Sequence, residues 1–258
     1  MTISSTTSEI QQGIWVIGYG SLIFKPPPLY SFKVTGYLKG YVRRFWQSSS
    51  DHRGTPESPG RVVTLVSLKD LKSNSKFHND LHMYELNGRP YESEILDESE
   101  SEKFSIQDID HKISQLTIDD LRVWGVAYYI SPEHVQEMKE YLDVREQDGY
   151  STHKVPFHII HTEDTPESKQ VLKHTQIDEK TGDYFIESMI YIGTIDNESF
   201  IGPESIQDTS NIIKHSKGPS GLNSEYLIKL ANAVRHLDDN GKSRDFYLED
   251  LVSLVAHN

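Results

Sequence analysis

Cysteine is absent from the 258 residues of this chain. A chain without cysteine has no disulfide framework, no thiolate nucleophile and no metal site that uses a cysteine ligand. Long apolar runs are absent as well, since none approaches the roughly 18 residues that a membrane-spanning helix requires. The composition fits a reducing compartment, and we expect a cytoplasmic protein with no membrane partner.

Basic residues are scarce: 26 lysines and arginines stand against 39 acidic residues, which gives a net charge of −13. Nucleic acid is therefore excluded as an expected partner, because neutralising phosphates needs a basic face. The charge is unevenly spread, with eight acidic residues and one lysine between positions 92 and 110. Arg43, Arg44, Arg53 and Arg61 instead form a local basic stretch, which is a candidate receptor for an anionic small molecule.

Six runs rich in β-branched and aromatic residues predict strands at 14–19, 34–47, 61–68, 122–130, 154–162 and 184–195. Apolar periodicity and capping residues predict helices from 132 to about 146, at 203–213, from a cap at Ser220, and at 245–256. Because long helices do not alternate with the early strands, we expect an α+β protein with a small, mostly antiparallel sheet or barrel.

The organisation predicted along the chain is one domain. Residues 1–12 are rich in serine and threonine and have neither the basic nor the apolar part of a secretion signal, so we expect a disordered leader. Residues 13–258 then form the domain. Its acidic segment at about 87–120 has the composition of a solvated insertion or loop.

The first candidate site is the loop that follows the apolar run 14–17. Gly18 and Gly20 can bring bare backbone N–H groups to the surface, where they can hold a carboxylate or other anion. A dinucleotide-binding loop is disfavoured, because Ile23 replaces the third glycine and the prolines after Lys25 cannot open a helix. A purely structural turn remains the alternative at this point.

Glu146 is the second candidate. At 100° per residue it continues the apolar stripe formed by Val135, Met138 and Leu142, close to the end of a predicted helix. Burial and the negative end of the helix dipole would both raise the pKa of its carboxyl, which suits a general base. The alternative is a frayed glutamate at a helix end, paired with Arg145.

Other constellations are weaker. The Gly-Pro-Ser-Gly segment at 218–221 precedes a predicted helix and is either an anion-binding N-terminus or a simple cap. His78 and His82 are read as exposed loop histidines, and His158 and His161 would lie on opposite faces of a strand. The sequence therefore predicts no metal site and no cofactor.

Several blocks in order resemble the γ-glutamylcyclotransferases, and among them the ChaC type that acts on glutathione. The first is the loop Val16, Ile17, Gly18, Tyr19, Gly20, Ser21, Leu22 and Ile23. The later blocks are Arg-Arg-Phe-Trp-Gln-Ser at 43–48, Asp-His-Arg-Gly-Thr-Pro at 51–56, Pro-Gly-Arg at 59–61, Tyr-Leu-Asp-Val-Arg-Glu-Gln-Asp-Gly-Tyr at 141–150, Tyr-Ile-Gly at 191–193, Gly-Pro at 202–203 and Gly-Pro-Ser-Gly-Leu-Asn-Ser-Glu-Tyr-Leu at 218–227. They cover about residues 14–237, apart from the acidic insertion. Phe24 departs from the family pattern, which usually has tryptophan or tyrosine there.

The resemblance implies a small β-barrel with helices around it, a γ-glutamyl group bound on the loop from Val16 to Leu22, and Glu146 as the catalytic carboxylate. It implies a lyase that cyclises the γ-glutamyl group of glutathione to 5-oxoproline and releases Cys-Gly, without metal or cofactor. Two alternatives stay open: cyclotransfer on other γ-glutamyl amino acids or amines, and a non-catalytic module that binds γ-glutamyl groups. The sequence leaves the oligomeric state open.

Overall fold

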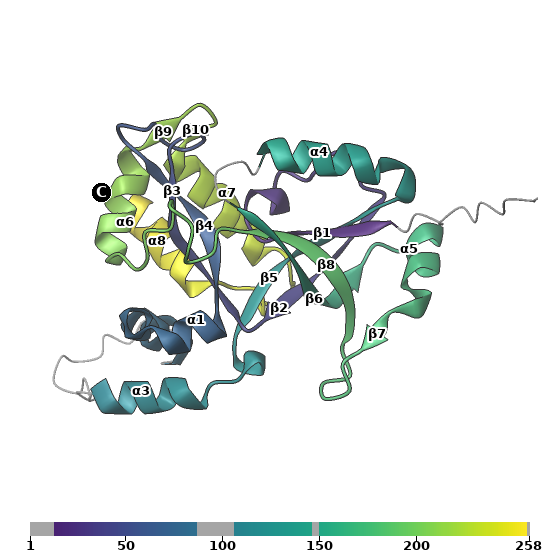
Figure 1. Cartoon of the computed structure of the whole chain (residues 1–258), viewed down its shortest axis with the longest axis horizontal. Helices are drawn as coiled ribbons and strands as arrows, with labels where there is room; N and C mark the ends of the chain where they lie inside the picture. The colour runs from purple at the N-terminus through teal and green to yellow at the C-terminus, as the bar shows by residue number, and fades with distance from the viewer. Residues whose placement is uncertain (1–12, 87–105, 146–149, 257–258) are drawn as a thin grey trace, which may run out of the picture.

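The computed structural model describes residues 13–86, 106–145 and 150–256. Five of its strands form a closed barrel in the order β1, β5, β2, β6, β8. They are β1 (Ile14–Gly18), β2 (Phe32–Lys39), β5 (Arg122–Ile130), β6 (Ser151–Thr162) and β8 (Tyr184–Ile192). The barrel closes where Val16 pairs in parallel with Met189, while the other neighbours are antiparallel. This mixed barrel with surrounding helices confirms the predicted α+β fold (Figure 1).

The strand predicted at 34–47 is two strands in the structure. β2 ends at Lys39, and β3 (Tyr41–Ser49) begins after Gly40. Gly40 has a φ of 75°, a left-handed conformation that glycine adopts at little cost. β3 leaves the barrel and pairs with β4 (Gly60–Ser67) in a separate two-stranded sheet. The break was not predicted because β-forming residues continue on both sides of the glycine.

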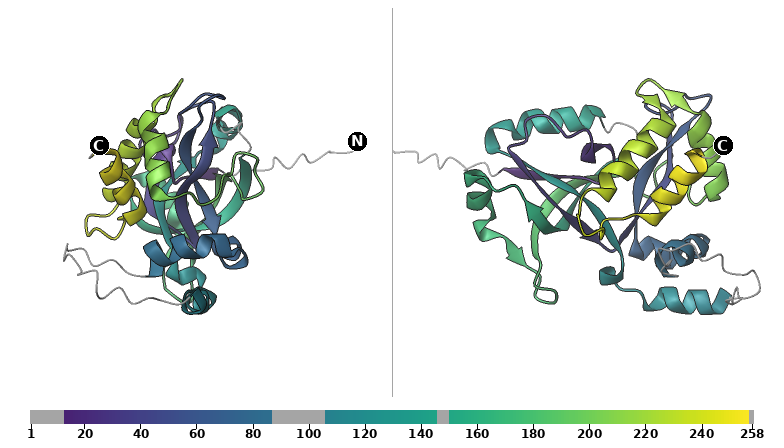
Figure 2. Two further views of the ribbon diagram at one scale, coloured as in Figure 1. Left: turned by 90° about the vertical axis from the view of Figure 1, so that its left-hand side faces the viewer. Right: turned by 180° about the vertical axis from the view of Figure 1, so that it is seen from behind.

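The four predicted helices are all present. They are α4 (Val135–Arg145), α6 (Ile206–His215), α7 (Asn223–Arg235) and α8 (Phe246–Ala256). The view from behind in Figure 2 shows α7 and α8 lying along the side of β3 and β4. α7 begins at Asn223 and not at the predicted cap Ser220, because Ser220 lies in the turn between the short strands β9 (Lys217–Gly218) and β10 (Gly221–Leu222).

Several short elements were not predicted. They are η1 (Ser21–Ile23), α1 (Leu68–Ser73), η2 (Ser75–Phe77), α2 (His78–Leu81), the π-turn η3 (His82–Leu86), α3 (Ile106–Gln115), η5 (Ile118–Asp120), η6 (Pro132–His134), α5 (Pro166–Val171), η7 (Leu172–His174) and β7 (Gln176–Ile177). His78 and His82 lie on this helical segment rather than in an exposed loop, and His82 is buried. Most of these elements are only one turn long, which is too short for a periodic pattern to emerge.

The acidic insertion predicted at 87–120 is described only from residue 106 onward. This part contains α3 and does not behave as a solvated loop, because Ile113 is 1% exposed and packs against Phe77 and Leu81 in a separate small core. Ile109 and Leu116 pack around the same core. The acidic composition concealed a helical spacing of apolar residues. The predicted leader 1–12 and residues 87–105 lie outside the described residues.

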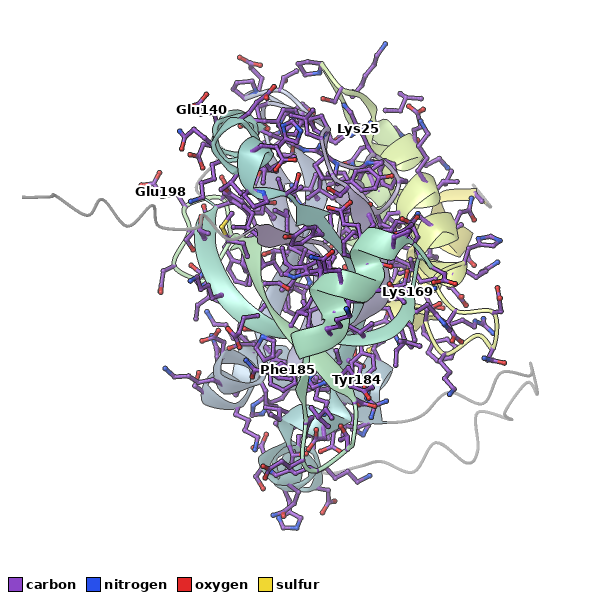
Figure 3. The ribbon with its side chains drawn as sticks, turned by 90° about the vertical axis from the view of Figure 1, so that its right-hand side faces the viewer. Lys25, Glu140, Lys169, Tyr184, Phe185 and Glu198 are labelled. Atoms are coloured by element: carbon purple, nitrogen blue, oxygen red, sulfur yellow. The ribbon has the colours of Figure 1, made fainter. Side chains whose placement is uncertain are left out.

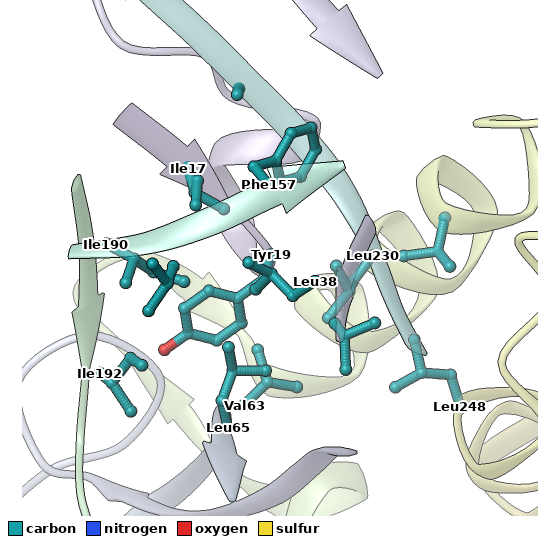
Figure 4. Packing of buried hydrophobic residues seen from close by; sticks show 14 of the residues in the cluster. Ile17, Tyr19, Leu38, Val63, Leu65, Phe157, Ile190, Ile192, Leu230 and Leu248 are labelled. Carbon is teal, nitrogen blue, oxygen red and sulfur yellow. The ribbon is translucent and has the colours of Figure 1, made fainter. Parts of the chain in front are cut away.

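Two hydrophobic cores meet at β1. Alternate residues of this strand face opposite sides, so Ile17 and Tyr19 point into the main core while Val16 joins the core beneath α4. Figure 4 shows the ring of Tyr19 surrounded by core side chains, with Ile190 and Val63 among them. In the part of the chain that the structure describes, no helix is both long and apolar enough to span a membrane.

Candidate active site

The loop Gly18–Leu22 leaves β1 between these two cores. It turns at once into the short 3₁₀ helix η1 (Ser21–Ile23), whose first hydrogen bond runs from the Ile23 N–H to the Gly20 carbonyl at 3.0 Å. The N–H groups of Ser21 and Leu22 precede this bond and so have no partner within the helix. Sequence reasoning predicted bare N–H groups in this loop; this stays a prediction, for which the start of η1 offers Ser21 and Leu22 as candidates.

Both glycines of the loop lie close to neighbouring atoms, and Gly18 has the less room of the two. A Cβ at Gly18 would lie 2.6 Å from the Cβ of Leu22, which is far inside van der Waals contact. A Cβ at Gly20 would lie 3.0 Å from a methyl of Val63 and 3.2 Å from the hydroxyl of Tyr226. The loop therefore folds tightly on itself at Gly18 and faces neighbouring side chains at Gly20.

Two side chains fix the loop from outside. Tyr128, which is 1% exposed, donates a hydrogen bond of 2.7 Å to the carbonyl of Leu22. Burial raises the pKa of the Tyr128 hydroxyl, so it keeps the proton that it donates. Arg145, the last residue of α4, donates to the hydroxyl of Ser21 at 2.7 Å and to that of Tyr141 at 3.1 Å. The end of α4 is thus attached directly to the loop.

A cavity of about 770 Å³ opens beside the loop. It is lined by Ser21, Phe24, Lys25, Ser48, Ser49, Asp51, His52, Arg53, Val62, Tyr141, Arg145, Tyr150, Pro219, Ser220 and Tyr226. A smaller recess of about 50 Å³ lies deeper, against the loop itself, and is lined by Ile17, Tyr19, Gly20, Ser21, Leu22, Val63, Tyr150, Tyr191 and Tyr226. Ser21, Tyr150 and Tyr226 line both, so the recess is the inner end of one site.

The predicted loop residues divide between the recess and its supports. Ile17, Tyr19, Gly20, Ser21 and Leu22 line the recess. Val16 is fully buried in the core beneath α4, and Gly18 is enclosed by the loop, so these two shape the site from behind.

Glu146 lies outside the described residues. The helix that leads to it does carry the predicted stripe, since Met138 and Leu142 are fully buried and Val135 packs on the same core. The described residues nearest to it in the chain, Arg145 and Tyr150, both line the cavity.

The predicted basic stretch is mostly structural, which corrects the reading of it as an anion receptor. Arg43, Arg44 and Arg61 are all buried, and each guanidinium donates at least one hydrogen bond within the protein. Their partners are the Trp124 carbonyl for Arg43, Asp80 and Glu85 at 2.6 and 2.9 Å for Arg44, and both carboxylate oxygens of Glu204 at 2.8 and 2.7 Å for Arg61. The positions of these partners, far away in sequence, could not be read from the chain. Arg53 is the member of the stretch that lines the cavity.

Sequence reasoning missed the aromatic walls of the site. Tyr226 was assigned only to the buried side of a helix, and Tyr141 and Tyr150 were noted only as parts of a family block. They come from α4, from the residue before β6 and from α7, and they meet only in the folded chain. Among the described residues no group of three histidine, aspartate or glutamate side chains is arranged to hold a metal ion.

Comparison with known proteins places this chain in a family. Residues 14–258 match the family model described as ChaC-like protein. The chain belongs to the ChaC-like family. A glutathione-specific gamma-glutamylcyclotransferase of Saccharomyces cerevisiae is 42% identical over 247 residues, covering 94% of this chain and 96% of the yeast protein. A protein of the same name from Schizosaccharomyces pombe is 32% identical and covers 96% of this chain and 95% of its own.

A solved structure supports the same assignment. The crystal structure of a selenomethionine-labelled gamma-glutamyl cyclotransferase specific to glutathione from yeast has a TM-score of 0.77 with this chain at 40% identity, covering 95% of this chain and 96% of its own. The barrel and its surrounding helices are therefore those of a family fold.

Proposed function

We propose that this ChaC-like protein cleaves glutathione by cyclising its γ-glutamyl group, which yields 5-oxoproline and Cys-Gly. The observation that carries the proposal is the narrow recess at the N–H groups of η1, joined to a cavity large enough for the rest of a peptide. The family membership and the names of the yeast relatives support it.

The reaction needs no nucleophile from the protein. The α-amine of the γ-glutamyl residue attacks its own γ-carbonyl carbon, a new C–N bond closes the five-membered lactam, and the isopeptide C–N bond breaks. One proton moves from the α-amine to the departing nitrogen. The protein contributes by holding the folded conformer, because correct orientation in an intramolecular reaction removes much of the entropic barrier.

The loop is proposed to bind the γ-glutamyl end. The Ser21 and Leu22 N–H groups would donate to a carboxylate or to the developing oxyanion, and Tyr128 and Arg145 keep these donors in place. Ile17 and Tyr19 contribute apolar surface to the lining of the recess. The rigidity of the loop is the feature that a positioning site requires.

Glu146 is proposed as the general base. The α-amine must lose a proton before it can attack, and a carboxylate that accepts it can return it to the leaving nitrogen. Glu146 directly follows Arg145, whose guanidinium contacts Ser21, and consecutive α-carbons lie about 3.8 Å apart. This adjacency supports the base role. We also propose a cytoplasmic location, since glutathione keeps that compartment reducing.

The Glu146→Gln variant tests the base role. We expect it to fold normally and to lose about 100-fold or more in the rate of 5-oxoproline formation, the usual range for removal of a general base. Glu140→Gln is the matched control, because Glu140 is exposed on α4, which ends one residue before Glu146, and its side chain bonds only with Gln136 among the described residues (Figure 3). If Glu146→Gln keeps a near-native rate, the base lies elsewhere.

The two alternatives, broader γ-glutamyl cyclotransfer and a non-catalytic binding module, can be tested by comparing two substrates. Incubation with glutathione and with a γ-glutamyl dipeptide that lacks the glycine, followed by detection of 5-oxoproline, distinguishes glutathione cleavage from broader γ-glutamyl cyclotransfer. A binding module would form 5-oxoproline from neither compound.

A further inference from the structure

The outer part of the cavity is more basic than the chain as a whole. Among the described residues, Lys25, Arg53 and Arg145 line the cavity together with one carboxylate, Asp51, although the chain carries a net charge of −13. Asp51 lies 3.3 Å from the Nε2 atom of His52. Arg145 is bonded to Ser21 at the inner end, so Lys25 and Arg53 are the cations of the outer part.

Arg53 is held rigidly by two loops that are joined through their backbones. The Ser220 N–H donates to the His52 carbonyl at 2.9 Å, and a Cβ at Gly218 would lie 2.3 Å from the same oxygen. The Nη1 atom of Arg53 donates to the Leu222 carbonyl at 3.0 Å. The loop at 50–59 and the turn at 217–222 are therefore packed so closely that the base of the arginine cannot shift far.

The guanidinium of Arg53 also lies over an aromatic ring. Its carbon is 5.3 Å from the ring centroid of Tyr226, a distance that allows a favourable cation–π contact. Tyr226 is 5% exposed and so offers a fixed platform. The arginine is thus oriented before any ligand arrives, which lowers the entropic cost of binding.

Hydrogen-bonding capacity remains on this guanidinium. Among the described residues the guanidinium of Arg53 makes one hydrogen bond, to the Leu222 carbonyl, and no ion pair within 4.0 Å. Glu225 is a carboxylate that acts on it electrostatically, and its Oε1 atom pairs with Lys229 at 2.6 Å. Arg44 and Arg61 differ in that carboxylates already occupy their donors. An oriented guanidinium with open N–H groups is suited to bidentate binding of a carboxylate.

Tyr226 sets the separation between Arg53 and the loop. Its hydroxyl is at the loop end, 3.2 Å from where a Cβ of Gly20 would be, while the face of its ring lies under Arg53. One tyrosine side chain thus separates the two ends of the site. The two residues that follow a γ-glutamyl group span roughly 7 Å when extended. The C-terminal carboxylate of a γ-glutamyl tripeptide can therefore reach Arg53 while its γ-glutamyl group occupies the recess.

We propose that Arg53 is the receptor for the C-terminal carboxylate of the substrate, and that this contact selects γ-glutamyl tripeptides over γ-glutamyl amines and amino acids. The inference rests on the proposed function, since it assigns the part of the same site that lies beyond the scissile bond. Lys25 is exposed on the rim and carries no such fixed geometry, so it is the competing candidate (Figure 3).

The test compares glutathione with its glycine monoethyl ester, which has the same backbone but no C-terminal charge. For the native protein we expect the KM for the ester to be about 10- to 100-fold higher than the KM for glutathione, the range for one charge-assisted hydrogen-bonded pair. Arg53→Ala should raise KM for glutathione by a similar factor with a smaller effect on kcat. The two changes should not add, because each removes the same contact.

Variants separate this role from a structural one. Arg53→Lys should lose part of the effect, since a lysine keeps the charge but not the planar fork. Arg122→Ala is the matched control: Arg122 lies 4.8 Å over the ring of Tyr37 on the barrel, outside this cavity, and its loss should leave both substrates unaffected.

Three results would overturn the inference. If Arg53→Ala raises KM by the same factor for glutathione and for the ester, the arginine only supports the loops. A selective loss on glutathione in Lys25→Ala, without one in Arg53→Ala, would assign the receptor to Lys25. If the native protein forms no 5-oxoproline from either compound, the proposed function itself fails, and this outcome differs from the other two because it appears before any substitution.

Discussion

The Gly18→Ala variant probes how tightly the substrate loop is built. The added methyl carbon would lie 2.6 Å from the Cβ of Leu22 and 3.2 Å from the Leu22 carbonyl carbon, whereas carbon atoms pack best at about 3.5–4.0 Å. The Leu22 backbone would have to move by roughly 1 Å. It cannot move freely, because its carbonyl accepts the hydrogen bond from Tyr128.

Two magnitudes follow from this overlap. Overpacking of this kind costs about 1–3 kcal/mol of unfolding free energy, which corresponds to a fall in Tm of about 2–12 °C for a chain of this size. Because Leu22 carries one of the N–H groups of the site, a shift of roughly 1 Å should also lower kcat/KM by up to about 100-fold. The loss of activity should persist at temperatures where the variant is fully folded.

Gly20→Ala provides the comparison. There the added carbon would meet only side-chain atoms, a methyl of Val63 at 3.0 Å and the hydroxyl of Tyr226 at 3.2 Å, which can adjust by a few tenths of an ångström. We expect a smaller loss of stability than in Gly18→Ala. Thermal unfolding and 5-oxoproline release by both variants are the measurements. Native stability and native kcat/KM in Gly18→Ala would refute the view that the loop is rigidly packed.

Two further predictions concern single polar contacts. Tyr128→Phe leaves the Leu22 carbonyl without its donor and should cost about 1–3 kcal/mol in denaturant unfolding, together with a rise in KM; an unchanged KM would show that this bond does not position the loop. The hydrogen bond from Lys39 is the main reason that the pKa of Asp178 falls from 3.8 to about 2. A carboxyl with a depressed pKa stabilises the fold above its unfolded pKa, and the contribution is lost as the pH falls through the folded one. Asp178→Asn should therefore be less stable than the native chain at pH 7, with a Tm difference that closes between about pH 4 and pH 2; a constant difference would contradict the assigned pair.

Most strands of the barrel were predicted from runs of β-forming residues between turn residues, and the main helices from apolar periodicity and capping residues. The strand at 122–130 and the helix at 245–256 differ from the structure by at most one residue. The single long strand at 34–47 was wrong because one glycine with positive φ redirects the chain, and nothing around Gly40 distinguishes it from a glycine within a strand.

The site was predicted unevenly for a physical reason. The loop after β1 is local, so its glycines and its apolar lead are visible in eight consecutive residues. The outer cavity instead depends on contacts between distant segments, such as the Ser220 N–H with the His52 carbonyl. The sequence placed Arg53 and Arg61 in one basic stretch. Only the structure shows that the guanidinium of Arg61 is bonded to Glu204, which leaves Arg53 as the arginine of the pair that is open to a ligand.

The most direct test of intramolecular cyclisation asks whether an oxygen atom from water enters the product. Purified protein is incubated with glutathione in water enriched in oxygen-18, and the products are identified by mass spectrometry. Attack by the substrate's own amine predicts unlabelled 5-oxoproline and Cys-Gly in equal amounts, because no water oxygen enters either product. Labelled glutamate would show hydrolysis by water, and it would contradict intramolecular cyclisation as the activity of this site.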